Sequence, residues 1–274
     1  MGDRKIWHGD QADGLRRLFG CQEPQIVAFA SGHEACGRTT LVVQTAAALA
    51  AAGHGVVIVD ENGGPNNILA TFGISTRNDL LHVVRGTRSA LQAALPAAPL
   101  VRVVAAAKAA RDLDHEDVSS RDRLAAVLRE LQQGASFVLI DCACRRPGHL
   151  SAAAALAGHV VVVVAAQGTA ITNAYALIKR IAQAQGRDRF QIAVARARSP
   201  EEARAVYENM RRVASDHLGV RLDYLGASAV PVTDHLADAL IRYLPSAPEL
   251  AGAEGFVATD RFAASQPGMQ ISVL

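Results

Sequence analysis

The sequence predicts an α/β fold: a doubly wound, mainly parallel sheet of about seven or eight strands with helices on both faces. Two observations predict it. From residue 25 onward, short apolar runs rich in β-branched residues alternate with helical patterns, and no internal repeat or long linker divides this block. Uninterrupted apolar strands that alternate with helices are typical of a parallel sheet that is buried on both faces. The first apolar run also leads through a glycine-rich turn into a long alanine-rich helical pattern, which is the setting of a phosphate-binding loop.

The predicted elements follow in chain order. Strands are expected at residues 25–30, 56–60, 100–104, 137–141, 159–164, 190–195 and 222–226. Helical spacing of apolar residues predicts helices at 39–52, 66–73, 79–84, 119–132, 171–184, 200–217 and 235–244. The apolar run 150–166 is interrupted by Gly158 and His159, so we interpret it as a helix followed by a buried strand and not as a membrane span. Residues 249–274 lose periodicity and are predicted to form a helix and a loose tail.

Composition limits the class of protein. The chain has 274 residues, enough for one large α/β domain, and its scarcity of aromatic residues predicts an aliphatic core. A net charge of +2 gives no polybasic character that would indicate nucleic-acid binding. The four cysteines form neither a disulfide framework nor a zinc-ligand pattern, and the N-terminus is polar where a signal peptide would be apolar. We therefore expect a cytoplasmic protein with reduced thiols.

A short amphipathic helix is predicted before the sheet begins. Asp10 is a suitable N-cap, Asp13 favours the positive end of a helix, and Gly20 is a suitable stop. Apolar residues between them fall on one face at helical spacing, namely Ala12, Leu15, Leu18 and Phe19. A helix this short is marginal alone in water. It is therefore expected to dock either on its own domain or on a partner, and composition does not distinguish the two.

Polar residues follow three of the predicted strands. The first is followed by the spacing Gly-x4-Gly-Arg-Thr at 32–39, in which backbone N–H groups and the start of the next helix can hold phosphate oxygens and Thr39 can ligate Mg²⁺. The second ends in Asp60, followed by Glu61 and Asn62, and the fourth ends in Asp141. Each aspartate alone could simply cap a turn. Together, at the carboxyl ends of parallel strands, they predict a nucleotide site.

Several segments resemble the MinD/ParA class of deviant P-loop ATPases, and within it the flagellar-number regulators called FlhG or FleN. Residues 33–39 are similar to the class motif Lys-Gly-Gly-x-Gly-Lys-Thr, and residues 59–67 to its Asp-Ala-Asp-Leu-Gly-Leu-Ala-Asn. The runs 169–179 and 218–226 also resemble the family closely. Residues 10–16 resemble the Asp-Gln-Ala-x-x-Leu-Arg element by which FlhG proteins engage and stimulate the SRP-type GTPase FlhF. The resemblance covers nearly the whole chain.

The resemblance implies two units, an FlhF-engaging helix and linker at 1–22 and a MinD-like P-loop domain with a C-terminal helix and tail at 23–274. It implies ATP and Mg²⁺ as cofactors. The implied nucleotide contacts are Gly32, His33, Cys36, Gly37, Arg38, Thr39 and Thr40. The implied metal ligands are Thr39, Asp60 and Asp141. The catalytic positions of the family are occupied by Asp60 and Asn62. Contacts to FlhF are implied for Asp10, Gln11, Leu15, Arg16 and Arg17. Further implied partners are flagellar switch (C-ring) proteins, a flagellar transcription regulator and a second copy of the chain.

The chain departs from the family pattern mainly within the predicted site. In the glycine-rich loop, His33 replaces the signature lysine, Arg38 replaces the phosphate-binding lysine, and Glu34 and Ala35 replace two glycines. Elsewhere, Asn62 replaces the second aspartate of its motif, and Ala195 replaces an asparagine that reads adenine. The glycine of the switch that follows Asp141 is also lost. Arginine is not a conservative exchange for lysine at a tight phosphate site, and an amide cannot act as a carboxylate. These changes predict a pseudo-ATPase in which hydrolysis is weak or lost.

Three functions follow from the sequence. The first is a regulator of flagellar number, placement and assembly that stimulates FlhF through its N-terminal helix. The alternative is a slow ATPase that cycles between a cytosolic monomer and a membrane-bound ATP dimer at the inner face of the membrane near the flagellated pole. Residues 249–274 lack the basic face of an interfacial helix, so membrane association is expected to be weak or absent. The third is nucleic-acid binding, but the arginines of 196–212 alternate with glutamates, which is typical of a solvated helix face.

Overall fold

The computed structural model describes residues 25–33, 35–113, 118–143 and 148–228. The predicted N-terminal helix, the predicted helix 235–244 and the stretch 249–274 lie outside the described residues. Among the helices of the described ranges, none is long and apolar enough to cross a membrane.

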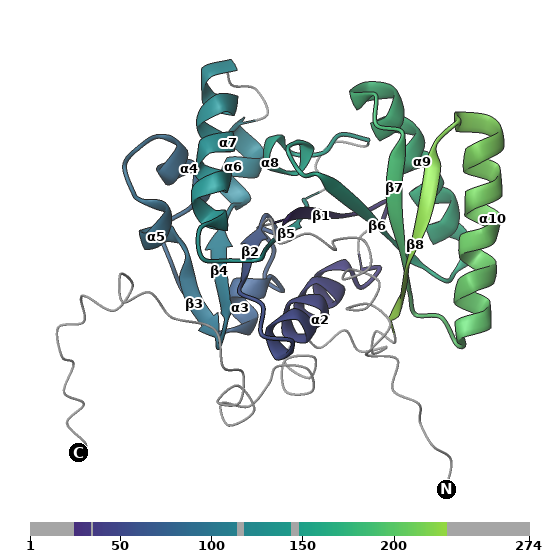
Figure 1. The fold of residues 1–274 in the computed structure, drawn as a ribbon, viewed down its shortest axis with the longest axis horizontal. Coiled ribbons are helices and arrows are strands. Elements are labelled where there is room, and N and C mark those ends of the chain that lie inside the picture. The colour runs from purple at the N-terminus through teal and green to yellow at the C-terminus, as the bar shows by residue number, and fades with distance from the viewer. Residues whose placement is uncertain (1–24, 34, 114–117, 144–147, 229–274) are drawn as a thin grey trace, which may run out of the picture.

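The described chain forms one sheet with helices on both faces (Figure 1). Its strands are β1 (Gln25–Ser31), β2 (Val56–Asp60), β3 (Leu95–Ala98), β4 (Val101–Ala105), β5 (Phe137–Asp141), β6 (His159–Ala165), β7 (Arg189–Ala195) and β8 (Arg221–Ser228). They lie in the order β3-β4-β2-β5-β1-β6-β7-β8. Neighbouring strands are parallel except for β3 and β4. The predicted fold class is therefore confirmed.

The helices agree with the sequence pattern where they are long. They are α2 (Arg38–Ala51), α3 (Ile68–Thr71), α4 (Leu80–Val84), α5 (Ala90–Ala93), α6 (Ala107–Asp112), α7 (Val118–Gln132), α8 (Ala152–Ala155), α9 (Gly168–Gln185) and α10 (Pro200–Leu218). The helix expected at 66–73 is shorter, because Asn67 caps it and its side chain accepts a hydrogen bond from the Ala70 N–H. Three short elements, β3, α5 and α6, were not predicted.

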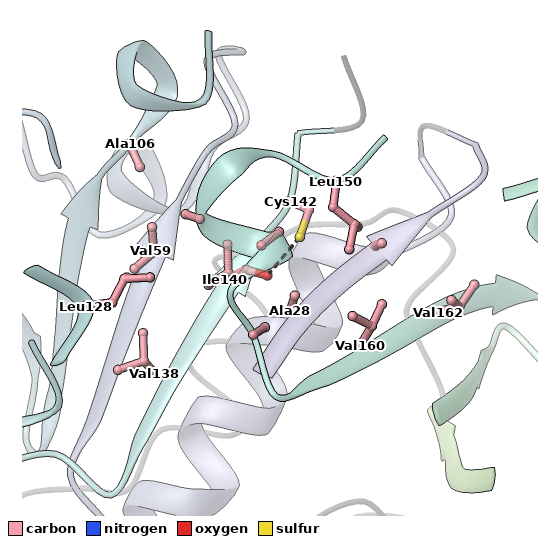
Figure 2. Close-up of a cluster of buried hydrophobic side chains, with 14 of the residues drawn as sticks. Ala28, Val59, Ala106, Leu128, Val138, Ile140, Cys142, Leu150, Val160 and Val162 are labelled. Atoms are coloured by element: carbon pink, nitrogen blue, oxygen red, sulfur yellow. Dashed lines mark hydrogen bonds between the residues drawn. The ribbon is translucent and has the colours of Figure 1, made fainter. Parts of the chain in front are cut away.

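Two hydrophobic layers enclose the sheet. Successive residues of a strand point to opposite faces, so Ala28 and Ala30 of β1 join one layer while Val27 and Phe29 join the other. The first layer packs against helices of the range α4–α10, and Figure 2 shows part of it around Val138, Ile140 and Val160. The second packs mainly against α2 and α3. The core is aliphatic, as the composition predicts.

The sheet brings three strand ends together. β5 lies between β1 and β2, and all three run parallel. Asp60 at the end of β2 is the register partner of Asp141 at the end of β5. Ser31 ends the neighbouring β1 and leads directly into the glycine-rich loop. The carboxyl edge of the central strands therefore collects the polar residues of the predicted site.

Candidate functional site

The loop after β1 is a tight turn that leads into the N-terminus of α2. Gly37 has φ 90° and precedes α2, so the first N–H groups of this 14-residue helix face the loop. Ala35 has φ 55°, a left-handed conformation that glycine adopts more easily. A Cβ at Gly32 would lie 2.3 Å from the backbone oxygen of Asn173 in α9, so only glycine fits there. Ala35 therefore stands at a position whose backbone conformation favours the glycine of the family pattern.

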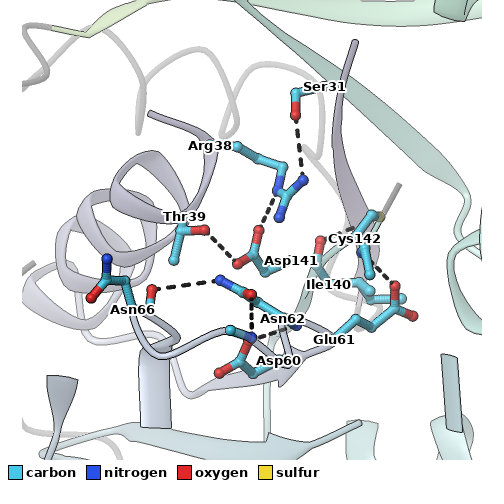
Figure 3. Close-up of polar contacts among 12 residues, drawn as sticks. Ser31, Arg38, Thr39, Asp60, Glu61, Asn62, Asn66, Ile140, Asp141 and Cys142 are labelled. Carbon is cyan, nitrogen blue, oxygen red and sulfur yellow. Dashed lines mark hydrogen bonds and ion pairs between the residues drawn. The ribbon is translucent and has the colours of Figure 1, made fainter. Parts of the chain in front are cut away.

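Arg38 is the cation at the centre of the site (Figure 3). Its Nε donates a hydrogen bond to Asp141 Oδ1 at 2.5 Å, and its Nη1 donates to Ser31 Oγ at 3.3 Å. The Thr39 hydroxyl donates to the other Asp141 oxygen, Oδ2, at 2.8 Å. The Arg38 side chain is 14% exposed and that of Asp141 is fully buried. Arg38 thus bridges the ends of β1 and β5 and neutralises Asp141.

Asp60 and Glu61 are held by other parts of the chain. Asp60 accepts hydrogen bonds from the N–H groups of Asn62 and Leu69, at 3.1 and 3.2 Å. Glu61 accepts one from the Ser151 hydroxyl and one from the Ala143 N–H at 3.0 Å. Glu61 therefore ties the end of β2 to the segment after β5 and to the first turn of α8.

Burial changes the acidity of these two groups. Removal from water, with a smaller contribution from the Asp141 charge, raises the pKa of Asp60 to about 7. Removal from water likewise raises the pKa of Glu61 to about 7, against the lowering effect of its two hydrogen bonds. Burial also raises the pKa of the Cys36 thiol in the loop. The site is therefore less negative near neutral pH than its carboxyl groups suggest.

Asn62 stands in the turn after β2. Its Oδ1 accepts a hydrogen bond from the Gly64 N–H at 2.9 Å, and its Nδ2 lies 3.5 Å from the Asn66 carbonyl oxygen. The amide therefore accepts one hydrogen bond and donates another within this turn, whereas an ionised aspartate could not donate to the Asn66 carbonyl oxygen. In this arrangement Asn62 has a clear structural use and offers no general base.

The structure brings together Arg38, Thr39, Asp60, Asn62 and Asp141 from three different segments of the chain. Cys36, Gly37 and Thr40 are buried in the loop and the first turn of α2, whereas Gly32 and His33 are exposed. Ala195 is buried at the end of β7. The predicted FlhF contacts, Asp10, Gln11, Leu15, Arg16 and Arg17, lie outside the described residues, as does Glu34.

Mg²⁺ prefers carboxylate and hydroxyl oxygens, which Thr39, Asp60 and Asp141 could supply. Each carboxylate oxygen of Asp60, Glu61 and Asp141, however, already accepts a hydrogen bond from the protein. A divalent cation at Asp141 would also face the Arg38 guanidinium. Within the described ranges, no group of three or more His, Cys, Asp or Glu side chains could hold a metal ion. As arranged, Asp141 already has a cationic partner in Arg38, and this ion pair disfavours Mg²⁺ at that carboxylate.

Two polar residues of this edge were not predicted as site residues. Ser31 receives the second Arg38 contact and Glu61 connects β2 to Ser151. The position of Glu61 between two other polar residues at a strand end is the signal that could have identified it. Its partner Ser151 lies 90 residues away along the chain, so local sequence gives no indication of the contact.

Known proteins resemble this chain over most of its length. A family model for AAA domains matches residues 24–194. The chain is 28% identical to the antiactivator FleN of Pseudomonas aeruginosa over 77% of this chain and 76% of that protein. It is 23% identical to the flagellum site-determining protein YlxH of Helicobacter pylori over 80% of this chain and 77% of that protein.

Solved structures share the fold. A chain of the MinC:MinD cell division protein complex of Aquifex aeolicus superimposes with a TM-score of 0.60 at 18% identity, over 90% of this chain and 98% of that one. The septum site-determining protein MinD of Pyrococcus horikoshii, complexed with Mg-ADP, gives a TM-score of 0.57 at 17% identity, over 83% of this chain and 92% of that one. The eight-stranded sheet is thus a P-loop NTPase sheet of the MinD type.

Proposed function

The chain belongs to the AAA-domain family, in the MinD/ParA class and its FleN/FlhG group, and from this we propose that it regulates the number and placement of flagella. The observation that carries the proposal is the extent of similarity to FleN and YlxH. It spans about three quarters of this chain and of each of those proteins, one described as an antiactivator and the other as flagellum site-determining.

Deletion of the gene in its own host tests this function. We expect a change in the number or position of flagella, counted by electron microscopy, and a return to the parental pattern when the gene is restored. An unchanged flagellar pattern in the deletion strain would contradict the proposal.

We further propose that the site binds ATP but hydrolyses it weakly or not at all. Two contacts support this. Asn62, at the position of the family's water-positioning aspartate, is an amide engaged with its own turn. Arg38, at the position of the phosphate-binding lysine, is engaged with Asp141. Steady-state phosphate release is expected to stay at the background of a protein-free control. Multiple turnovers by the purified chain would show that the site is an active ATPase.

The regulatory output that we propose is stimulation of the GTPase FlhF by residues 1–22, through Asp10, Gln11, Leu15, Arg16 and Arg17. A glutamine can orient the attacking water, and an arginine can offset transition-state charge, the latter an effect of roughly 10³–10⁵ in known arginine-finger systems. A peptide of residues 1–20 is expected to accelerate GTP hydrolysis by FlhF, and Gln11→Ala to reduce that acceleration. An inactive wild-type peptide, or a fully active Gln11→Ala peptide, would remove this part of the proposal.

A second candidate function is a slow ATPase that dimerises with ATP on a membrane. The observation in its favour is the MinD-type fold, one neighbour of which holds Mg-ADP. Co-sedimentation with anionic liposomes, with and without ATP, separates the two candidates. ATP-dependent sedimentation supports the cycling ATPase. Its absence supports a regulator that works through flagellar partners, such as FlhF, switch proteins or a transcription regulator.

A further inference from the structure

We propose that Arg38 takes the place of the metal ion at Asp141, so that the loop binds the phosphates of a nucleotide without a divalent cation. The inference rests on the proposed nucleotide site and adds to it the form of the ligand, a metal-free nucleoside phosphate.

The first support is the geometry at Asp141. Its carboxylate receives Arg38 Nε on one oxygen at 2.5 Å and the Thr39 hydroxyl on the other at 2.8 Å. The guanidinium is fixed from a second side by Ser31 Oγ at 3.3 Å. A metal ion at Asp141 would have to share these oxygens with both donors. It would also stand beside a positive charge that is largely withdrawn from water, where repulsion is strong.

The second support is the state of the neighbouring acids. Asp60, the register partner of Asp141, directs its two oxygens to the N–H groups of Asn62 and Leu69. Glu61 directs its two oxygens to Ser151 and Ala143. Neither carboxylate is arranged toward a shared ion. Asp141 is the carboxylate that has a cationic partner at these strand ends, and that partner is the protein's own arginine.

The third support is the chemistry of arginine. A guanidinium binds carboxylate and phosphate oxygens in the same planar geometry, and it cannot lose its charge. A side chain that already pairs with Asp141 at the start of α2 can therefore offset phosphate charge beside the helix N-terminus, where N–H groups favour anions. Because Arg38 already supplies a positive charge at this position, a bound metal ion would compete with Arg38 and would not supply a charge that the site lacks.

Nucleotide titrations of the full-length wild-type chain test the inference without any substitution. The probe is a fluorescent ATP analogue, titrated in excess EDTA and again in excess Mg²⁺. We expect Kd values that agree within about threefold, or tighter binding in EDTA. Binding that tightens about tenfold or more with Mg²⁺ would overturn the inference. Absence of binding in both buffers would overturn it as well, while the flagellar phenotype tests the proposed function independently.

Direct metal binding gives a second readout that needs no nucleotide. Mn²⁺, followed by electron paramagnetic resonance, is expected to bind the wild-type chain no better than the matched variant Asp141→Asn. Removal of the internal cation by Arg38→Ala is expected to create Mn²⁺ binding, which Asp141→Asn then abolishes in the double variant. Circular dichroism checks that each variant is folded. Mn²⁺ binding by the wild-type chain that is lost in Asp141→Asn would show that the metal, and not Arg38, belongs at this carboxylate.

Discussion

At the scale of single residues, Ala35 shows a local conflict between sequence and backbone. It has φ 55° in the loop between β1 and α2. A left-handed conformation costs an L-residue roughly 1–2 kcal/mol, whereas glycine adopts it freely. We therefore predict that Ala35→Gly raises the free energy of unfolding by about 1 kcal/mol, measured by urea denaturation.

The matched control for this substitution is Ala205→Gly. Ala205 is exposed within α10, where the backbone is helical. The same chemical change is expected to lower the free energy of unfolding there by about 1 kcal/mol, because glycine is a poor helix former. If both variants were destabilised alike, the left-handed backbone at Ala35 would not be a source of strain.

Glu61 makes stability depend on pH. Burial raises its pKa from 4.5 to about 7. Between these two values the native state holds a proton that the unfolded chain releases, so the free energy of unfolding falls as the pH rises from about 4.5 to about 7. We predict that Glu61→Gln reduces this slope in denaturation curves taken across that range. Asp60, whose pKa is also raised to about 7, should account for a remaining slope.

Glutamine suits this position because its oxygen can accept from the Ala143 N–H while its amide donates to the Ser151 hydroxyl. Glu61→Ala serves as the comparison. It also removes the charge, but it leaves two buried donors without an acceptor and should cost about 2–4 kcal/mol at all pH values. An unchanged pH slope in Glu61→Gln would mean that Glu61 is ionised over the whole range in the native state.

The aspartates of the site are predictable from the sequence, but the ion pair that one of them forms is not. Asp60 and Asp141 end apolar runs, and parallel pairing then places them side by side. The ion pair between Arg38 and Asp141 joins residues 103 apart in the chain and depends on the direction of a long side chain. Motif comparison treats Arg38 as a substituted phosphate ligand. Only the three-dimensional arrangement shows it as the partner of a buried acid.

At the scale of elements, the loop after β1 packs closely against the backbone of α9. A Cβ on Gly32 would lie 2.3 Å from the Asn173 oxygen and 2.7 Å from the Ala174 nitrogen, which are backbone atoms that cannot turn aside. We predict that Gly32→Ala displaces the loop from α9 and lowers the free energy of unfolding by at least about 2 kcal/mol, measured by denaturation.

Gly168, the first residue of α9, provides the control within the same helix. A Cβ there meets nothing within 4 Å. Gly168→Ala is expected to leave stability unchanged or to raise it slightly, since alanine is the better helix former. Equal effects at the two glycines would mean that the loop and α9 separate without loss of stability.

Long elements were predictable because their signal lies within the element itself. The strand and helix patterns of β1, β6, α7 and α10 repeat over enough residues to be distinguished. The short helix α6 depends instead on a distant residue. The Asp79 carboxylate accepts hydrogen bonds from the N–H groups of Lys108 and Ala109, 29 and 30 residues along the chain. Local periodicity contains no trace of such a contact, so α6 was missed.

At the scale of the whole molecule, the hydrophobic residues that stabilise the fold lie apart from the polar residues of the candidate site. The two hydrophobic layers cover the faces of the sheet, and the polar residues gather where β1, β2 and β5 end. Changes at that edge can therefore alter ligand binding while the layers stay intact. This separation explains how the family's fold can persist in a chain whose site residues differ at His33, Arg38 and Asn62.

The same separation leads to a prediction for the N-terminal segment. All eight strands of the described sheet and both described hydrophobic layers are built from residues 25–228. We therefore predict that removal of residues 1–22 shifts the thermal unfolding midpoint by no more than about 2 °C but abolishes stimulation of FlhF. Full-length Gln11→Ala is the matched control, since it should weaken stimulation without shortening the chain. A large fall in the midpoint would instead support the other possibility that the sequence left open, in which this segment docks on its own domain and stabilises it.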